Sequence, residues 1–194
     1  MPEPEIYQIR LKALELLEEQ AQNGSIDLYY GDESKVCEKG YVPYAWQFHD
    51  EKLSIPSTHG QSLNCFGLLT RTNDLIFSTT QKPINTDFVI EILETLSLKI
   101  KKSTVIVLDN AKIHTSRKIK ERLKYWQNRG LYIFYLPPYS PHLNIIERLW
   151  KELKARWIKP EDYASPQTLF LATYLALAAV GNQLFIHYNQ FKLS

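Results

Sequence analysis

Three short apolar runs constrain the fold of this chain more than any other feature. They are residues 26–34, 103–110 and 131–137, and each is apolar over most of its length, with acids at the end of the first two. Strands that are buried on both faces of a parallel sheet have this composition. Segments with helical spacing of apolar residues separate them. The order predicts an α/β fold, a mixed sheet flanked by helices.

The rest of the chain predicts further elements of the same architecture. Residues 62–70 and 75–80 flank a polar turn and predict a β-hairpin, and residues 44–48 suggest another strand. Residues 1–25 are expected to form an N-terminal helix, over 3–22, ahead of one domain at 26–194. Within that domain, helices are expected over residues 86–100, 115–129, 144–157 and 166–188.

The last of these helices requires a membrane test, because residues 164–191 contain no Asp, Glu, Lys or Arg. Its continuous apolar part, Leu169 to Val180, has 12 residues, whereas a spanning helix needs roughly 20. A buried helix is therefore expected, with no membrane partner. Cys37 and Cys65 form no CxxC pair, and the N-terminus does not resemble a signal peptide. We expect a cytoplasmic, nucleoid-associated protein with reduced thiols.

Charge is unevenly distributed along the chain, although the net charge is only +2. Residues 1–51 carry a net charge of −7 and residues 99–130 carry +8. A phosphate-binding face requires such a concentration of bases, and an ordinary solvated helix face can also have one. Arg117, Lys118 and Lys120 are the candidate DNA-binding residues of this segment.

Two aspartates follow apolar strands in the same way. Leu28, Tyr30 and Asp32 share one face of the first strand by alternation, and Val105, Val107 and Asp109 share one face of the second. Ligands of α/β sheets bind beyond the carboxyl ends of strands. Two acids placed there repel each other unless a cation lies between them, and Mg²⁺ takes such oxygen ligands. The alternative is that each aspartate starts a turn or caps a helix.

Glu147 and His114 each allow two interpretations. Asn144 and Glu147 have the spacing of a capping box, and Glu147 and Lys151 have that of a helical ion pair. Glu147 could instead be a third metal-binding carboxylate, with Lys151 and Lys154 beside it to meet DNA. His114, five residues after Asp109, could contact the substrate or make a hydrogen bond at the start of a helix.

The strings VLDNAKIHTS and FYLPPYSPHLNIIERLWKELK resemble the catalytic core of bacterial insertion-sequence transposases of the mariner superfamily. The YGDES segment resembles the strand of that family that bears its first acid, and the resemblance covers roughly residues 26–160. These proteins are DDE endonucleases with a ribonuclease H-like fold. Asn110, His114, Pro138, Ser140 and Asn144 match motif positions that support the site, and Ile145 replaces the family's usual proline.

The resemblance implies a catalytic triad of Asp32, Asp109 and Glu147 that holds two Mg²⁺ ions, with Mn²⁺ as a substitute. It implies cut-and-paste transposition: water cleaves the strand at the element end, and the freed 3′-hydroxyl attacks target DNA. Asp32 is expected to bridge both ions. DNA contacts are expected from His114, Arg117, Lys118, Lys120, Lys151 and Lys154.

The front of the chain departs from the family, whose members carry helix-turn-helix domains before the catalytic core. Only about 25 residues precede the first strand. We therefore expect a split-gene half, a truncated copy or an excised catalytic piece. A separately encoded helix-turn-helix protein is an expected partner, and a homodimer is expected in the active complex. The alternatives in function are a catalytically silent, transposase-derived DNA-binding or regulatory protein, and a nuclease for RNA–DNA hybrids.

Overall fold

A five-stranded mixed sheet forms the centre of the protein. The computed structural model describes residues 4–38 and 60–188, and the strand suggested at 44–48 lies outside these ranges. The sheet order is β3-β2-β1-β4-β5, with β1 parallel to β4, β4 parallel to β5, and the other pairs antiparallel. This is the mixed α/β sheet that the sequence predicts. The strands are β1 (Asp27–Cys37), β2 (Ser62–Leu69), β3 (Leu75–Thr80), β4 (Thr104–Leu108) and β5 (Leu131–Tyr135).

Strand β1 is longer than its apolar run suggests. It pairs with β4 only as far as Tyr30, which lies opposite Val107, but it continues beside β2 through Cys37. Asp32 therefore lies inside β1, opposite Gly67, and not at its end. The sequence prediction of a strand that ends in acids was wrong here, because the hairpin partner continues to satisfy the backbone where the parallel neighbour stops.

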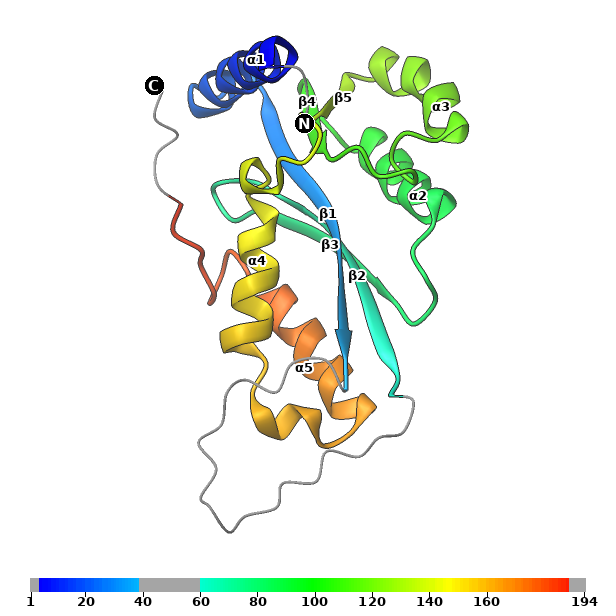
Figure 1. The fold of residues 1–194 in the computed structure, drawn as a ribbon, viewed down its shortest axis with the longest axis vertical. Helices are drawn as coiled ribbons and strands as arrows, with labels where there is room; N and C mark the ends of the chain where they lie inside the picture. The colour runs from blue at the N-terminus through cyan, green and yellow to red at the C-terminus, as the bar shows by residue number, and fades with distance from the viewer. Residues whose placement is uncertain (1–3, 39–59, 189–194) are drawn as a thin grey trace.

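Five helices cover the two faces of the sheet (Figure 1). Helices α2 (Thr86–Ser97) and α3 (Arg117–Asn128) share one apolar cluster with the face that includes Phe66 and Ile106. Helices α1 (Pro4–Gln22), α4 (Ile146–Glu152) and α5 (Pro166–Ala179) share the other cluster, with Tyr30 and Val107. In Figure 1, the yellow α4 and orange α5 lie on one side of β1, and the green α2 and α3 on the other.

The ends of the helices differ from the predicted ones for local reasons. Helix α3 begins after Ser116, whose side chain accepts a hydrogen bond from the Ile119 amide. Helix α4 is short and passes into a π-helical turn at Leu153–Trp157. Helix α5 ends at Ala179, nine residues before the predicted end, and Gly181 follows with a φ of +81°. No helix within the described ranges is long and apolar enough to cross a membrane.

A buried ion pair fastens α1 to the sheet. Glu18 is almost fully buried, accepts a hydrogen bond from the Tyr30 hydroxyl, and pairs with Arg71 at 2.7 Å. Arg71 belongs to the turn between β2 and β3, so three separate segments meet at one carboxylate. This contact holds the first helix against the strand that carries Asp32.

Candidate active site

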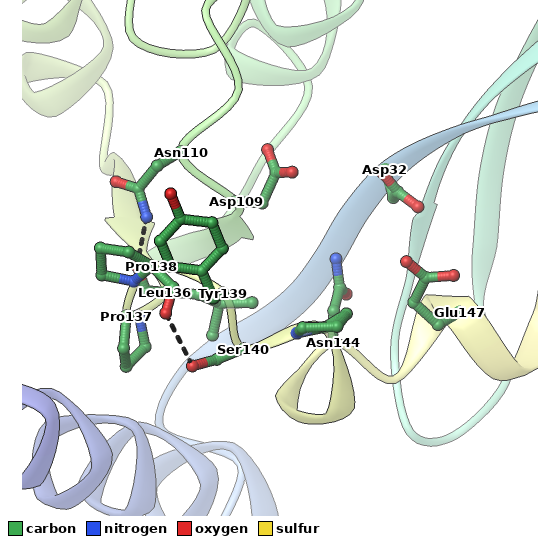
Figure 2. Close-up of a pocket in the computed structure, with 11 residues that line it drawn as sticks. Asp32, Asp109, Asn110, Leu136, Pro137, Pro138, Tyr139, Ser140, Asn144 and Glu147 are labelled. Carbon is green, nitrogen blue, oxygen red and sulfur yellow. Dashed lines mark hydrogen bonds between the residues drawn. The ribbon is translucent and has the colours of Figure 1, made fainter. Parts of the chain in front are cut away.

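A pocket of about 390 Å³ opens where β1 passes the carboxyl end of β4. Asp32, Asp109 and Glu147 line it together with the loop that follows β5, so the structure brings the three predicted acids to one cavity. Figure 2 shows Asp32 and Glu147 on one side, Asp109 across from them, and the loop from Leu136 to Ser140 beside Asp109. The pocket therefore has a carboxylate side and a side made mainly of proline and Tyr139.

Asp32 is the half-buried acid of the group. Burial, and next the charges of Glu147, Glu33 and Asp109, raise the pKa of Asp32 to about 7. Desolvation and like charges both disfavour the ionised form, and no cationic side chain lowers this pKa. The position favours a carboxylate only when a cation accompanies it.

Asp109 follows β4 directly and is held from behind. Its Oδ1 accepts hydrogen bonds from the Ala111 amide at 2.9 Å and from Nδ1 of His114 at 2.8 Å. The hydrogen bond from His114 is the main cause that lowers the pKa of Asp109. Oδ1 of Asp109 therefore has the turn-forming role that was the alternative interpretation. Oδ2 has no hydrogen bond within the described residues, and the Asp109 side chain is 52% exposed.

His114 is fully buried on the α2 and α3 side of the sheet. Its Nε2 lies 3.2 Å from Oε1 of Glu33, and its ring packs edge-on against Phe66. Burial opposes protonation, but the contacts with Asp109 and Glu33 raise the pKa of His114 to about 9. The predictions of a DNA contact and of a helix-start hydrogen bond were both wrong, because the imidazolium is enclosed between two carboxylates and Ser116 caps the helix.

Asn144 connects β1 to the start of α4. Its Nδ2 donates to the Gly31 carbonyl at 3.1 Å, and its own carbonyl accepts from the Glu147 amide at 3.2 Å. The capping-box interpretation was therefore wrong, because the Asn144 side chain bonds across to β1 and caps no helix. The Glu147–Lys151 ion pair is also absent among the described residues. Glu147 is exposed and lines the pocket.

Two glycines near Asp32 allow side chains of neighbouring elements to pack directly against the backbone. A Cβ at Gly67, the partner of Asp32 across the sheet, would lie 3.0 Å from Cδ1 of Ile146 and 3.1 Å from Cη2 of Trp150. A Cβ at Gly31 would lie 2.6 Å from a methyl group of Leu108. Helix α4 thus rests directly on the strand beside Asp32, and this brings Glu147 to the pocket.

A family model described as DDE superfamily endonuclease matches residues 27–169. The chain belongs to this family. The match includes all three acids of the pocket as well as α4. No curated protein matches the chain.

Solved structures show that the DDE endonuclease has the ribonuclease H-like fold of transposase and integrase cores. One is the Mos1 transposase paired-end complex with left transposon end (13% identity, 92% of this chain, 60% of that chain, TM-score 0.54). Another is the Mos1 paired end complex with Mg (13%, 94%, 62%, 0.52). The third is a simian T-cell lymphotropic virus intasome bound to a PP2A regulatory subunit (13%, 84%, 51%, 0.56). The chain spans half to three fifths of their length.

The predicted basic residues lie on two different faces of the DDE endonuclease. Lys151 and Lys154 follow Glu147 along α4 and the turn after it, and Lys151 lines a second hollow beside the acid pocket. Arg117, Lys118 and Lys120 lie on α3, which packs on the opposite face of the sheet. Arg117 pairs with Glu121 and Lys118 with Asp87, so two of these bases have acidic neighbours.

Sequence reasoning missed three contributors to this site. Glu33 was not distinguished from its neighbour, although alternation along β1 places it on the face opposite to Asp32. Gly67 carries no signal without knowledge of its partner strand. Tyr139 stood within the matched motif, but nothing in the sequence predicts that its ring is 88% exposed.

Proposed function

We propose that this chain is the catalytic core of a transposase that cleaves DNA at the ends of an element and joins the freed 3′-end to target DNA. The observation that carries the proposal is the meeting of Asp32, Asp109 and Glu147 in one pocket of a DDE endonuclease. Similarity to complexes of Mos1 transposase with transposon DNA supports it. The bacterial insertion-sequence branch, the homodimer and a separate helix-turn-helix partner remain predictions.

We propose that the three acids hold Mg²⁺, or Mn²⁺ in its place. Within residues 4–38 and 60–188, no three acid, histidine or cysteine side chains stand close enough to hold one ion. The donor chemistry nevertheless fits, because all three are hard oxygen ligands and the raised pKa of Asp32 marks a carboxylate without a cationic neighbour. When bound, such ions stabilise the charge that develops on the phosphate and acidify the attacking water.

The protein's own residues then have separable tasks in this proposal. His114 keeps Asp109 ionised and occupies its Oδ1, which leaves Oδ2 for the pocket. Asn144 keeps the start of α4 against β1 and so keeps Glu147 beside Asp32. In this proposal Lys151 and Lys154 would meet phosphates of the DNA strand, and the bases of α3 would serve a different stretch of DNA.

The test uses duplex DNA that carries the ends of the element encoding the protein. The wild-type chain should nick it in Mg²⁺ or Mn²⁺, and Asp109→Ala should reduce nicking by several orders of magnitude. Asp87→Ala, which removes an exposed acid on α2, is the matched control and should keep full activity. Full activity of Asp109→Ala would refute the assignment. A wild-type protein that binds DNA but never cuts it would favour the silent, regulatory alternative.

A further inference from the structure

Tyr139 is the most exposed large hydrophobic side chain of the described chain, with 88% of its surface accessible. It lines the acid pocket, and Figure 2 shows its ring standing beside Asp109 and Asn110. An aromatic ring in this position gains almost nothing from packing within its own protein. The proposed cleavage function does not use it either, so its presence at the pocket mouth needs another explanation.

The backbone holds this ring in place at a conformational cost. Tyr139 has a φ of +58°, in the left-handed region that side-chain-bearing residues rarely adopt. The residues around it are held in place, because Pro137 and Ser140 are buried and the Ser140 hydroxyl donates to the Pro138 carbonyl at 3.3 Å. Asn110 anchors the start of the loop by donating to the Leu136 carbonyl at 2.5 Å. Strain of this kind is concentrated at functional sites.

The prolines of the loop at residues 136–143 also restrict its backbone. Prolines at 137, 138 and 141 fix three φ angles within five residues. The Leu143 amide bonds to the Ser140 carbonyl at 3.1 Å and closes the loop's far end. A ring presented by such a loop is already ordered, so little conformational entropy is lost when a ligand stacks on it.

The two sides of the pocket together match a nucleotide. The acids form the side that would face a phosphate through bound cations, and Leu136, Pro137, Pro138, Pro141 and Tyr139 form an apolar and aromatic side. A base within a duplex has both of its faces covered by neighbouring bases. Only an unstacked base can lie flat on a tyrosine ring, and such stacking is tolerant of sequence.

We propose that Tyr139 stacks on an unpaired base next to the phosphate that is cleaved, and so positions a single-stranded nucleotide in the pocket. This inference rests on the proposed function, because it takes the acid pocket as the site of cleavage. It assigns to Tyr139 a contact with the face of a base. A phenol that instead donated a hydrogen bond to phosphate would need its hydroxyl and not its ring.

Binding can be tested without cleavage. The probe is a single-stranded oligo(dT) of about 12 nucleotides, a length within the range of known single-strand sites, with one 2-aminopurine. Its fluorescence should be quenched by the wild type and by Tyr139→Phe, and Tyr139→Ala should bind roughly tenfold more weakly. Tyr125→Ala removes a 59% exposed tyrosine on α3, outside the pocket, and should behave as wild type. Equal weakening by Tyr139→Phe and Tyr139→Ala, or wild-type binding by Tyr139→Ala, would overturn the proposal.

Cleavage then locates the base. Abasic nucleotides are placed one at a time around the cleavage position in element-end DNA. At the stacked position, the abasic substrate should be cleaved by the wild type on the order of tenfold more slowly than intact DNA. Tyr139→Ala should cleave intact DNA with a similar loss, and it should cleave the abasic substrate no more slowly than that. Additive losses at every position would overturn the stacking. Asp109→Ala should still quench the probe, so failure of the nuclease assignment and failure of the stacking give different results.

Discussion

The side-chain amide of Asn144 donates a hydrogen bond to the main-chain carbonyl of Gly31 over 3.1 Å, and both residues are buried. Gly31 precedes Asp32, and the main-chain carbonyl of Asn144 accepts a hydrogen bond from the Glu147 amide. One residue therefore sets the spacing of two acids that belong to different elements. Its effect on activity should exceed its effect on folding.

The variant Asn144→Ala removes this connection. We expect DNA nicking to fall about 10–100-fold, the range seen when the supports of metal ligands are lost, with about 1–3 kcal/mol of lost stability from the unpaired Gly31 carbonyl. Nicking rates and urea unfolding measure the two effects. Asn128→Ala, at an exposed position near the end of α3, is the control and should change neither. An Asn144→Ala enzyme with wild-type rates would show that the bond does not position the acids.

Replacing Asp32 should raise the Tm of the metal-free protein but remove the increase in Tm that Mg²⁺ produces. Because its pKa is raised to about 7, the ionised carboxylate destabilises the folded protein at pH 8 without metal. Asp32→Asn should therefore raise the metal-free Tm by a few degrees, roughly 2–4 °C per kcal/mol. Mg²⁺ should raise the Tm of the wild type and not that of Asp32→Asn.

The control for that measurement lies on the same strand. Asp27→Asn removes an exposed partner of Lys102, and we expect the Mg²⁺-dependent rise in Tm to persist. Chelation by EDTA should reverse the rise in both proteins that show it. A Tm of Asp32→Asn that still rises with Mg²⁺ would place the ion elsewhere.

Replacing His114 should affect Asp109 more than the fold alone would predict. His114→Gln keeps a hydrogen-bond donor but loses the charge between Asp109 and Glu33. We expect nicking to fall by about 10–100-fold and stability to fall by about 1–3 kcal/mol. The double variant His114→Gln/Glu33→Gln distinguishes the effect of the His114 charge on its carboxylate neighbours from the effect of its packing. If His114 acts only through packing against Phe66, the losses from the two substitutions should simply add.

An ion pair remote from the pocket predicts acid sensitivity. Hydrogen bonds from Arg129 and Trp126 lower the pKa of Glu94 below its usual value. A lowered folded-state pKa stabilises the protein above the ordinary glutamate pKa, and this contribution disappears as the pH falls through the folded-state value. The wild type should exceed Glu94→Gln in stability by about 0.5–1 kcal/mol at pH 7 and by less at pH 3, as measured by urea unfolding. A difference that is constant with pH would contradict this.

Replacing Gly67 by alanine should lower the activity more than the stability of the protein. An alanine methyl group would press on Ile146 and Trp150, and α4 would have to shift by a few tenths of an ångström. Alanine also restricts the unfolded chain, which offsets part of the cost of the contact. We expect Gly67→Ala to lose about tenfold in nicking, since small misplacements of reacting groups are costly. Ile146→Val removes the closest methyl group and should restore part of the rate.

The strands and the two aspartates were predictable because local patterns determine them. The apolar runs at β4 and β5, the hairpin turn, and the alternation that places Asp32 with Tyr30 all follow from the sequence. The continuation of β1 past Asp32 was not predictable, because it depends on pairing with β2 some thirty residues later. The same holds for His114 and Asn144, whose partners lie on other elements. Local capping rules therefore gave wrong roles for both.

Helix α4 approaches Asp32 over Gly67, while Leu68 and Leu108 pack against Gly31 from the other face of the sheet, so neither position has room for a side chain. Copies of a gene like this one should therefore lose activity through a change at either glycine, with all three acids intact. A survey that judges whether related elements are still mobile by the three carboxylates alone would count such copies as active. The glycines opposite and before the first aspartate belong in that survey, because an added methyl group there should lower activity while all three carboxylates stay in place.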